Sequence, residues 1–117
     1  YSSAASDVYK RQMLEWMFWE QYSHEPYVAV ARFRVRYEGQ PVNSLEPRLV
    51  ERGAAALQRL EDALAAGSFL VGDQLSLADV ALVAYTRLAG EGGFDLSRYP
   101  KVQAWIARVE AVLPIKD

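Results

Sequence analysis

The side chain in this sequence best suited to acid–base chemistry is His24, which carries the only imidazole. Its unperturbed pKa of about 6.5 lets it gain or lose a proton near neutral pH. Glu20 lies four residues before His24 and Tyr27 three residues after it, so on a helix the three share one face. No nucleophile accompanies them. The residues alone therefore favour a histidine that forms hydrogen bonds from a helix face. For the three residues together, a solvated polar stripe is one interpretation and the lining of a cleft is the other.

A second pair of polar residues, Ser76 and Asp79, precedes a strongly apolar run with the spacing of a capping box. In a capping box the serine hydroxyl accepts a hydrogen bond from the Asp79 N–H, and the carboxylate accepts one from the Ser76 N–H. A buried aspartate is also a candidate catalytic base. Because capping accounts for both residues, we predict a structural role for this pair and no catalytic residue in the chain.

The composition excludes several classes of site. The chain has 117 residues, 51% of them hydrophobic, a net charge of −2 and no cysteine. Disulfides and cysteine-ligated metals are therefore excluded, and a single histidine disfavours multi-histidine metal sites. The near-neutral charge gives no electrostatic basis for binding nucleic acid, and no apolar run approaches the ~20 residues that cross a bilayer. We expect one soluble, cytoplasmic domain with no metal, no nucleic-acid partner and no membrane association.

The elements that would position these residues are all helices. The apolar residues of segment 13–38 predict one long helix kinked at Pro26, or two helices in series. Polar and apolar residues alternate over residues 32–37 as in a strand, but no pairing partner or hairpin turn lies nearby. Residues 45–64 carry an apolar stripe with helical spacing, and residues 100–113 carry another. We predict an all-α bundle of about four or five helices.

Two apolar segments constrain the packing of this bundle. Residues 77–85 contain one polar residue in nine, which predicts a helix that other helices surround at the centre of the domain. Residues 16–19 are four consecutive large apolar residues, which a helix with one buried side cannot cover, so we expect them to be exposed or to mediate association. Residues 1–12 show no helical or strand periodicity. We interpret them as an adaptor- or vector-derived leader and assign the fold to residues 13–117.

Residues 69–79 closely resemble the signature of the C-terminal helical domain of bacterial-type glutathione S-transferases. In that family an apolar-Val-Gly-Asp turn, here ending at Asp73, leads into a Ser/Thr-x-x-Asp cap on a buried helix. The run from Tyr99 to Arg108 is similar to the family's late helix. The segment around Pro26 is similar to its first helix, in which plant phi-like classes also have a proline. The resemblance covers residues 13–113 and implies the helical bundle of that C-terminal domain.

The resemblance also implies a function. Family members have an N-terminal thioredoxin-like domain that holds most of the glutathione site and the activating Ser, Tyr or Cys, and this chain contains no such segment. The helical domain would supply part of the hydrophobic co-substrate pocket and a homodimer interface. Glutathione and a hydrophobic electrophile would bind the intact protein, with no cofactor in this chain, and the isolated chain would be inactive. The residues implied for the pocket are Glu20, His24, Tyr27, Phe33 and Tyr37.

Other interpretations stay open at this point. For the implied pocket residues, a solvated stripe around His24 and ordinary core packing of Phe33 and Tyr37 are the alternatives. For the whole chain, the alternative is a non-enzymatic interaction module, since domains of this fold also occur in translation elongation factor subunits and aminoacyl-tRNA synthetase complexes. A stand-alone helical bundle is a third possibility, and the apolar run at residues 16–19 argues against it.

Overall fold

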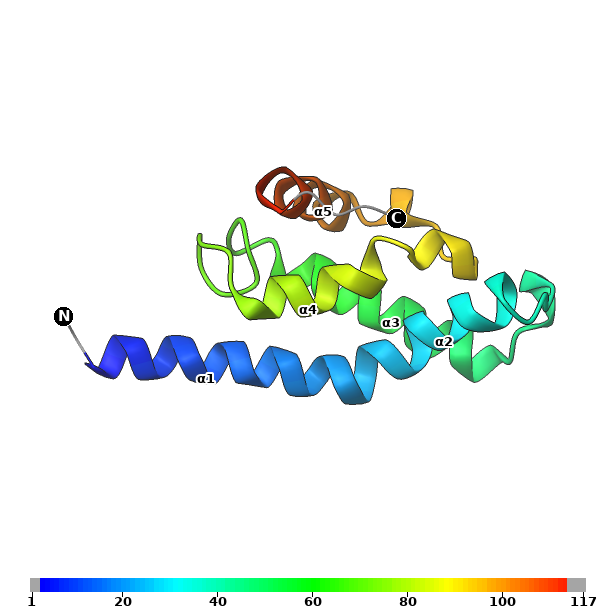
Figure 1. The fold of residues 1–117 in the computed structure, drawn as a ribbon, viewed down its shortest axis with the longest axis horizontal. Coiled ribbons are helices and arrows are strands. Elements are labelled where there is room, and N and C mark those ends of the chain that lie inside the picture. Colours follow the sequence, from blue (N-terminus) through cyan, green and yellow to red (C-terminus); the bar gives the residue numbers. More distant parts are fainter. Residues whose placement is uncertain (1–2, 114–117) are drawn as a thin grey trace.

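The computed structural model describes residues 3–113, and it places only helices and their connections within that range. It therefore confirms the predicted all-α class. Figure 1 shows α1 and α2 end to end along one side, α4 in the middle and α5 on the opposite side. Short 3-10 turns lie between α2 and α3 and between α4 and α5. The elements in chain order are α1 (Ser3–Trp19), the π-helical turn η1 (Glu20–His24), α2 (Glu25–Arg36), η2 (Val42–Ser44), α3 (Pro47–Ala63), α4 (Leu77–Thr86), η3 (Ala89–Gly92), η4 (Leu96–Arg98) and α5 (Pro100–Val112).

The first long helix is interrupted by a π turn and not by a sharp kink at the proline. The Glu25 N–H donates to the Glu20 carbonyl, five residues earlier, which closes the π turn just before Pro26. Pro26 then occupies the first turn of α2, where its missing N–H is tolerated. The chain therefore forms two helices in series with a π turn between them. Residues 32–36 are part of α2, so the helical interpretation of the alternating segment is confirmed.

Helix α1 begins at Ser3, well inside the segment interpreted as a leader. The sequence showed no periodicity there because the side chains that the structure describes between Ser6 and Gln12 are exposed or only half-buried. Such a segment needs no apolar stripe, since it extends a helix that is already formed and elongation is easier than nucleation. Residues 3–12 therefore belong to the helical fold, and their foreign origin stays a prediction.

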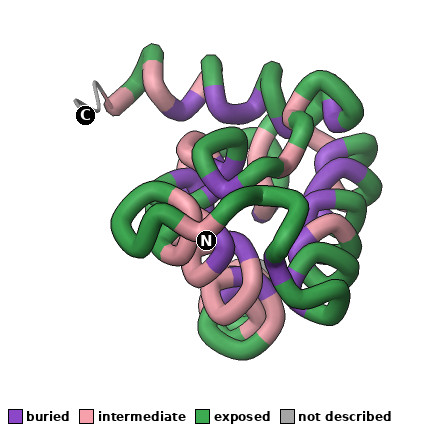
Figure 2. Tube along the Cα trace, turned by 90° about the vertical axis from the view of Figure 1, so that its right-hand side faces the viewer, coloured by how far each residue is buried: buried purple, intermediate pink, exposed green. Residues whose placement is uncertain are grey.

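The main core lies between α3, α4 and α5. The stripe predicted over residues 45–64 is buried, and its members Leu57 and Leu60 contact a core cluster that includes Leu82, Val102 and Trp105. Figure 2 shows the buried positions of α5 on the side that faces the other helices. Each fully buried side chain of this size contributes about 1.5 to 3 kcal/mol, so this cluster accounts for much of the stability of the bundle.

Helix α4 is not surrounded on every side, which corrects the prediction for residues 77–85. Leu82 and Val83 are fully buried, but Leu77 is 60% exposed and Tyr85 is 40% exposed. The rest of the described chain therefore leaves part of the apolar surface of α4 uncovered. A helix that is apolar on all faces and covered on only some of them leaves apolar surface for another segment, chain or ligand.

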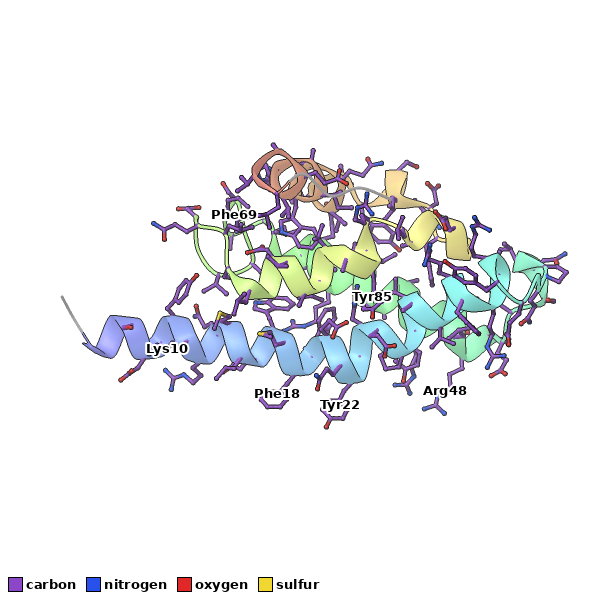
Figure 3. The ribbon with its side chains drawn as sticks, viewed as in Figure 1. Lys10, Phe18, Tyr22, Arg48, Phe69 and Tyr85 are labelled. Carbon is purple, nitrogen blue, oxygen red and sulfur yellow. The ribbon has the colours of Figure 1, made fainter. Side chains whose placement is uncertain are left out.

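The apolar run at residues 16–19 is covered in part by the chain itself. Trp16 and Trp19 pack against the main core with their rings edge to face, 5.3 Å apart. Phe18 remains 61% exposed. Together with Leu14 and Tyr22 it forms an exposed apolar stripe at four-residue spacing. Figure 3 shows Phe18 and Tyr22 projecting away from the bundle.

Candidate functional site

A hollow between α2 and α4 brings two of the predicted pocket residues together. Phe33 and Tyr37 come from the last turns of α2, and Tyr85 reaches the same hollow from α4 (Figure 3). The hollow has a volume of about 280 Å³. Small-molecule sites in proteins are concave and mostly lined by apolar and aromatic side chains. This α2–α4 hollow is therefore a candidate small-molecule site. Its other lining residues are Glu25, Ala29, Val30 and Arg32.

The aromatic wall of the α2–α4 hollow is held in place by charged neighbours. The rings of Phe33 and Tyr37 lie 5.8 Å apart, and the guanidinium of Arg32 lies 5.5 Å from the centre of the Tyr37 ring. Glu91 in η3 accepts a hydrogen bond from Arg32 Nε at 2.9 Å and lies 3.7 Å from Arg36 Nε. This ion pair is partly exposed, so it contributes to positioning more than to stability.

The close approach of η3 to α2 makes that arrangement possible. Gly92 is buried, and a Cβ atom built on it would lie 2.7 Å from the backbone nitrogen of Arg32. Only glycine fits at this contact without moving the two backbones apart. Gly92 thus lets η3 carry Glu91 close to Arg32.

Glu20 and His24 are buried together away from the α2–α4 hollow. Thr86 Oγ1 donates to the Leu82 carbonyl at 2.7 Å, so it accepts the 2.8 Å hydrogen bond from His24 Nε2. The other imidazole nitrogen, Nδ1, is then unprotonated and lies 3.9 Å from Glu20 Oε1. Neither atom of this second contact has a hydrogen-bond partner among the described residues. The solvated polar stripe considered for these residues is therefore wrong, because both side chains are buried.

Burial controls the ionisation of this pair. It lowers the pKa of His24 to about 4, so the imidazole is neutral at neutral pH. Burial, and then repulsion from Glu25, raises the pKa of Glu20 above its ordinary value. A neutral imidazole already committed to Thr86 has no exposed proton to exchange with a ligand in this structure.

Tyr27 lies on yet another side of the bundle. Its ring faces α3, where the Arg52 guanidinium lies 5.9 Å from the ring centre. The α-helical spacing placed Tyr27 on the face of Glu20 and His24, but the intervening turn is a π turn. Because a π turn holds more residues per turn, the residues after it point to a different side than α-helical spacing predicts. The five residues implied for the pocket are thus divided among three places.

The capping box predicted at Ser76 and Asp79 is present at the start of α4, and Asp79 does more than cap. Its Oδ2 accepts from the Ser76 N–H at 2.9 Å, while its Oδ1 accepts from Trp105 Nε1 at 2.8 Å and from the Leu70 N–H at 3.0 Å. One buried carboxylate therefore joins α4, α5 and the turn before α4. Sequence reasoning missed Trp105 because its 26-residue separation from Asp79 leaves no local pattern.

The described part of the chain contains neither a candidate metal site nor a helix that could span a membrane. Among residues 3–113, no three His, Cys, Asp or Glu side chains are grouped so that they could hold a metal ion. Within the same residues, every helix is too short or too polar to span a membrane.

Residues 16–112 match the family model described as the C-terminal domain of glutathione S-transferase. The chain belongs to the glutathione S-transferase family. A glutathione S-transferase from Pseudomonas fluorescens Pf-5 superimposes with a TM-score of 0.85 at 52% identity, over 90% of this chain and 53% of that one. A glutathione S-transferase from Xanthobacter autotrophicus Py2 gives a TM-score of 0.84 at 46% identity, over 93% of this chain and 54% of that one.

A curated relative of this glutathione S-transferase domain agrees with the structural matches. The glutathione S-transferase-like protein gedE of Aspergillus terreus is 26% identical over 115 residues, which cover 87% of this chain and 51% of that protein. The chain therefore spans about half the length of the proteins it matches. The matches establish the C-terminal helical domain of the family, and they agree with the sequence signature at residues 69–79.

Proposed function

We propose that this domain forms one wall of the hydrophobic co-substrate pocket in an enzyme that transfers glutathione to electrophiles. The observation that carries the proposal is the α2–α4 hollow, in which Phe33 is 53% exposed and Tyr37 is 63% exposed. Exposed aromatic side chains gathered around a hollow favour binding of an apolar aromatic molecule. Orientation of that molecule beside the glutathione thiol is what such a wall would contribute to catalysis.

The thiol of glutathione would be activated by residues outside this chain. The resemblance assigns this activation to a Ser, Tyr or Cys of the N-terminal domain. Within this chain cysteine is absent, and the only histidine is buried, neutral and bonded to Thr86. Ure2p, which shares the fold at 21% identity with a TM-score of 0.74, has been solved in complex with glutathione. That complex supports glutathione as the co-substrate of the intact protein. We also propose a cytoplasmic location for the intact protein. The isolated chain would bind electrophiles weakly and would not catalyse conjugation.

We also propose that the intact protein is a homodimer. The side chains of the stripe on α1 and η1 are largely exposed, at 50% for Leu14, 61% for Phe18 and 73% for Tyr22. Figure 3 shows Phe18 and Tyr22 pointing away from the other helices. Burying such a stripe against a second copy removes apolar surface from water at about 25 cal/mol per Å². The same stripe is the observation that favours the second candidate, a non-enzymatic module that docks onto a different protein.

An activity assay with the purified 117-residue chain tests whether thiol activation requires residues outside it. Glutathione and 1-chloro-2,4-dinitrobenzene, an aromatic electrophile, are incubated with the chain, and conjugate formation is followed by absorbance. No rate above the uncatalysed reaction is expected. A rate that scales with chain concentration and persists in a homogeneous preparation would contradict the proposal, because it would place the thiol-activating group within these residues.

A further inference from the structure

One acidic side chain that lines the α2–α4 hollow has no partner. Glu25, in the first turn of α2, is partly buried at the edge of the hollow. Among residues 3–113, its carboxylate takes part in no ion pair and no hydrogen bond. Its charge acts on its surroundings, because repulsion from Glu25 contributes to the raised pKa of Glu20. The lining therefore contains a negative charge that is available to a ligand.

The basic side chain of the same lining is already neutralised. Arg32 Nε donates to Glu91 at 2.9 Å, and its guanidinium lies over the Tyr37 ring. Arg36 shares Glu91 at 3.7 Å, but it is not part of the lining and its side chain is 61% exposed. Water and salt screen an exposed charge of this kind. Of the two charged residues in the lining, Glu25 is therefore the one that the described chain leaves unbalanced.

The start of α2 presents no free backbone donor beside this carboxylate. Helix N-termini attract anions through N–H groups that lack a partner within the helix. Here the Glu25 N–H donates to the Glu20 carbonyl, and Pro26 has no N–H. The π turn thus carries the hydrogen bonding of α1 into α2. The end of the hollow at Glu25 therefore favours a cationic group.

The spacing of the lining residues on α2 defines the shape of a fitting ligand. Glu25, Ala29 and Phe33 follow one another at four-residue intervals, so they lie along one face of the helix, about 6 Å per interval along its axis. Ala29 carries only a methyl group, which leaves room between the carboxylate and the Phe33 ring. Tyr85 lines the same hollow from α4. A ring placed against Phe33 and Tyr85 can therefore extend a short charged arm over Ala29 to Glu25.

We propose that Glu25 determines the specificity of the α2–α4 hollow, which favours aromatic electrophiles that carry a positively charged group over neutral ones of the same shape. The proposal rests on the co-substrate role proposed for this hollow and assigns a substrate class to it. The carboxylate accepts charge-assisted hydrogen bonds from the cationic group, and such bonds are stronger than neutral ones. The aromatic side chains contact the ring and also attract a nearby cation through their faces.

An NMR titration of the full ¹⁵N-labelled chain tests the proposal with two probes that differ only at the end of a short arm. The probes are 2-(4-nitrophenyl)ethylammonium and 2-(4-nitrophenyl)ethanol, and the amide shifts of Phe33 and Tyr85 report their binding. The ammonium is expected to bind about fivefold more tightly than the alcohol. Glu25→Gln should weaken binding of the ammonium by about fivefold and change binding of the alcohol by less than about twofold.

Glu51→Gln is the matched control. Glu51 is an exposed glutamate of α3 that lies outside the hollow and has no ion pair among the described residues. Both substitutions change the net charge of the chain equally, so only a local role of Glu25 separates them. Ammonium binding to Glu51→Gln should stay within about twofold of the parent chain. Glu25→Asp, which keeps a carboxylate, should bind the ammonium more tightly than Glu25→Gln does.

Two results would overturn this specificity alone. One is equal binding of the two probes, and the other is an equal loss of ammonium affinity in Glu25→Gln and Glu51→Gln, which would indicate attraction to the net negative charge of the chain. In both cases an aromatic molecule still binds at Phe33 and Tyr85, so the proposed co-substrate role stands. If neither probe shifts the amides of these two residues, the specificity and the co-substrate role are both contradicted.

Discussion

The carboxylate of Asp79 accepts a 2.8 Å hydrogen bond from the indole nitrogen of Trp105, and both side chains are fully buried. This contact ties the start of α4 to the middle of α5. The same carboxylate caps α4 and accepts from the Leu70 N–H, so a single residue fixes the relative positions of three segments. The position of α4, and with it that of Tyr85 in the α2–α4 hollow, depends on this junction.

Asp79→Ala is expected to lower the free energy of unfolding by about 3 to 5 kcal/mol. The substitution leaves the indole N–H of Trp105 and the backbone N–H groups of Leu70 and Ser76 without their acceptor in a buried place. Urea denaturation measures the change. Asp95→Ala is the control, because Asp95 caps the exposed turn η4 with a similar pair of bonds to Ser97. An Asp79 variant no less stable than the Asp95 variant would contradict the junction.

Stability is expected to fall as the pH falls from about 6.5 to 4. Burial lowers the pKa of His24 from 6.5 to about 4, so in this window the unfolded chain binds a proton that the folded chain does not. Across this window the titration of His24 lowers the free energy of unfolding by up to about 3 kcal/mol. Glu20 acts in the opposite direction, because its raised pKa makes the folded chain hold a proton above pH 4.5. The stabilisation that Glu20 contributes is therefore lost as the pH rises.

The two contributions can be separated with His24→Gln. Urea denaturation at several pH values between 4 and 7 gives the stability of the parent chain and the variant. The variant, which cannot titrate at this position, should lose less stability on acidification than the parent chain. Parallel stability curves for the two proteins would show that His24 is not a buried neutral imidazole.

Gly92→Ala is expected to destabilise the fold by about 1 to 3 kcal/mol, because the new methyl group would meet the backbone of α2 at Arg32. Gly90→Ala is a matched control in the same turn, since a Cβ atom there has no neighbour within 4 Å. Denaturation curves of both variants give the comparison. Equal stability of the two would mean that η3 does not lie against α2 as closely as described.

The exposed stripe on α1 and η1 is expected to support self-association. A Phe18→Ser and Tyr22→Ser double variant should sediment as a monomer at concentrations where the parent chain is dimeric, because it removes two large apolar side chains from the contact. Val112→Ser on α5 removes an exposed apolar side chain of the opposite face as a control. A parent chain that sediments as a monomer at every concentration would count against the proposed homodimer.

The helices that could be predicted from the sequence are those whose patterns are local. The stripe of α3 follows the helical period, and the Ser76–Asp79 cap needs only a three-residue spacing. The resemblance of residues 69–79 to the family signature predicted how these helices are arranged in the bundle. These features depend on neighbours in the sequence, so one chain is enough to find them.

The features that could not be predicted depend on contacts between distant segments. The π turn before Pro26 changes which side Tyr27 faces, and no residue pattern distinguishes it from a kink. The exposure of Leu77 and Tyr85 depends on which faces of α4 the other helices cover. His24 finds its partner in Thr86, 62 residues later, so its burial could not be inferred from its own segment.

The central claim, that the α2–α4 hollow receives an aromatic co-substrate, is tested most directly by NMR. The ¹H–¹⁵N spectrum of the labelled chain is recorded during titration with 1-chloro-2,4-dinitrobenzene. Shift changes are expected at the amides of Phe33, Tyr37 and Tyr85, with loss of the response in Phe33→Ser and its retention in Val112→Ser. Changes confined to the surface between η1 and α3, around Tyr27 and Arg52, with none at Phe33 or Tyr85, would contradict the account.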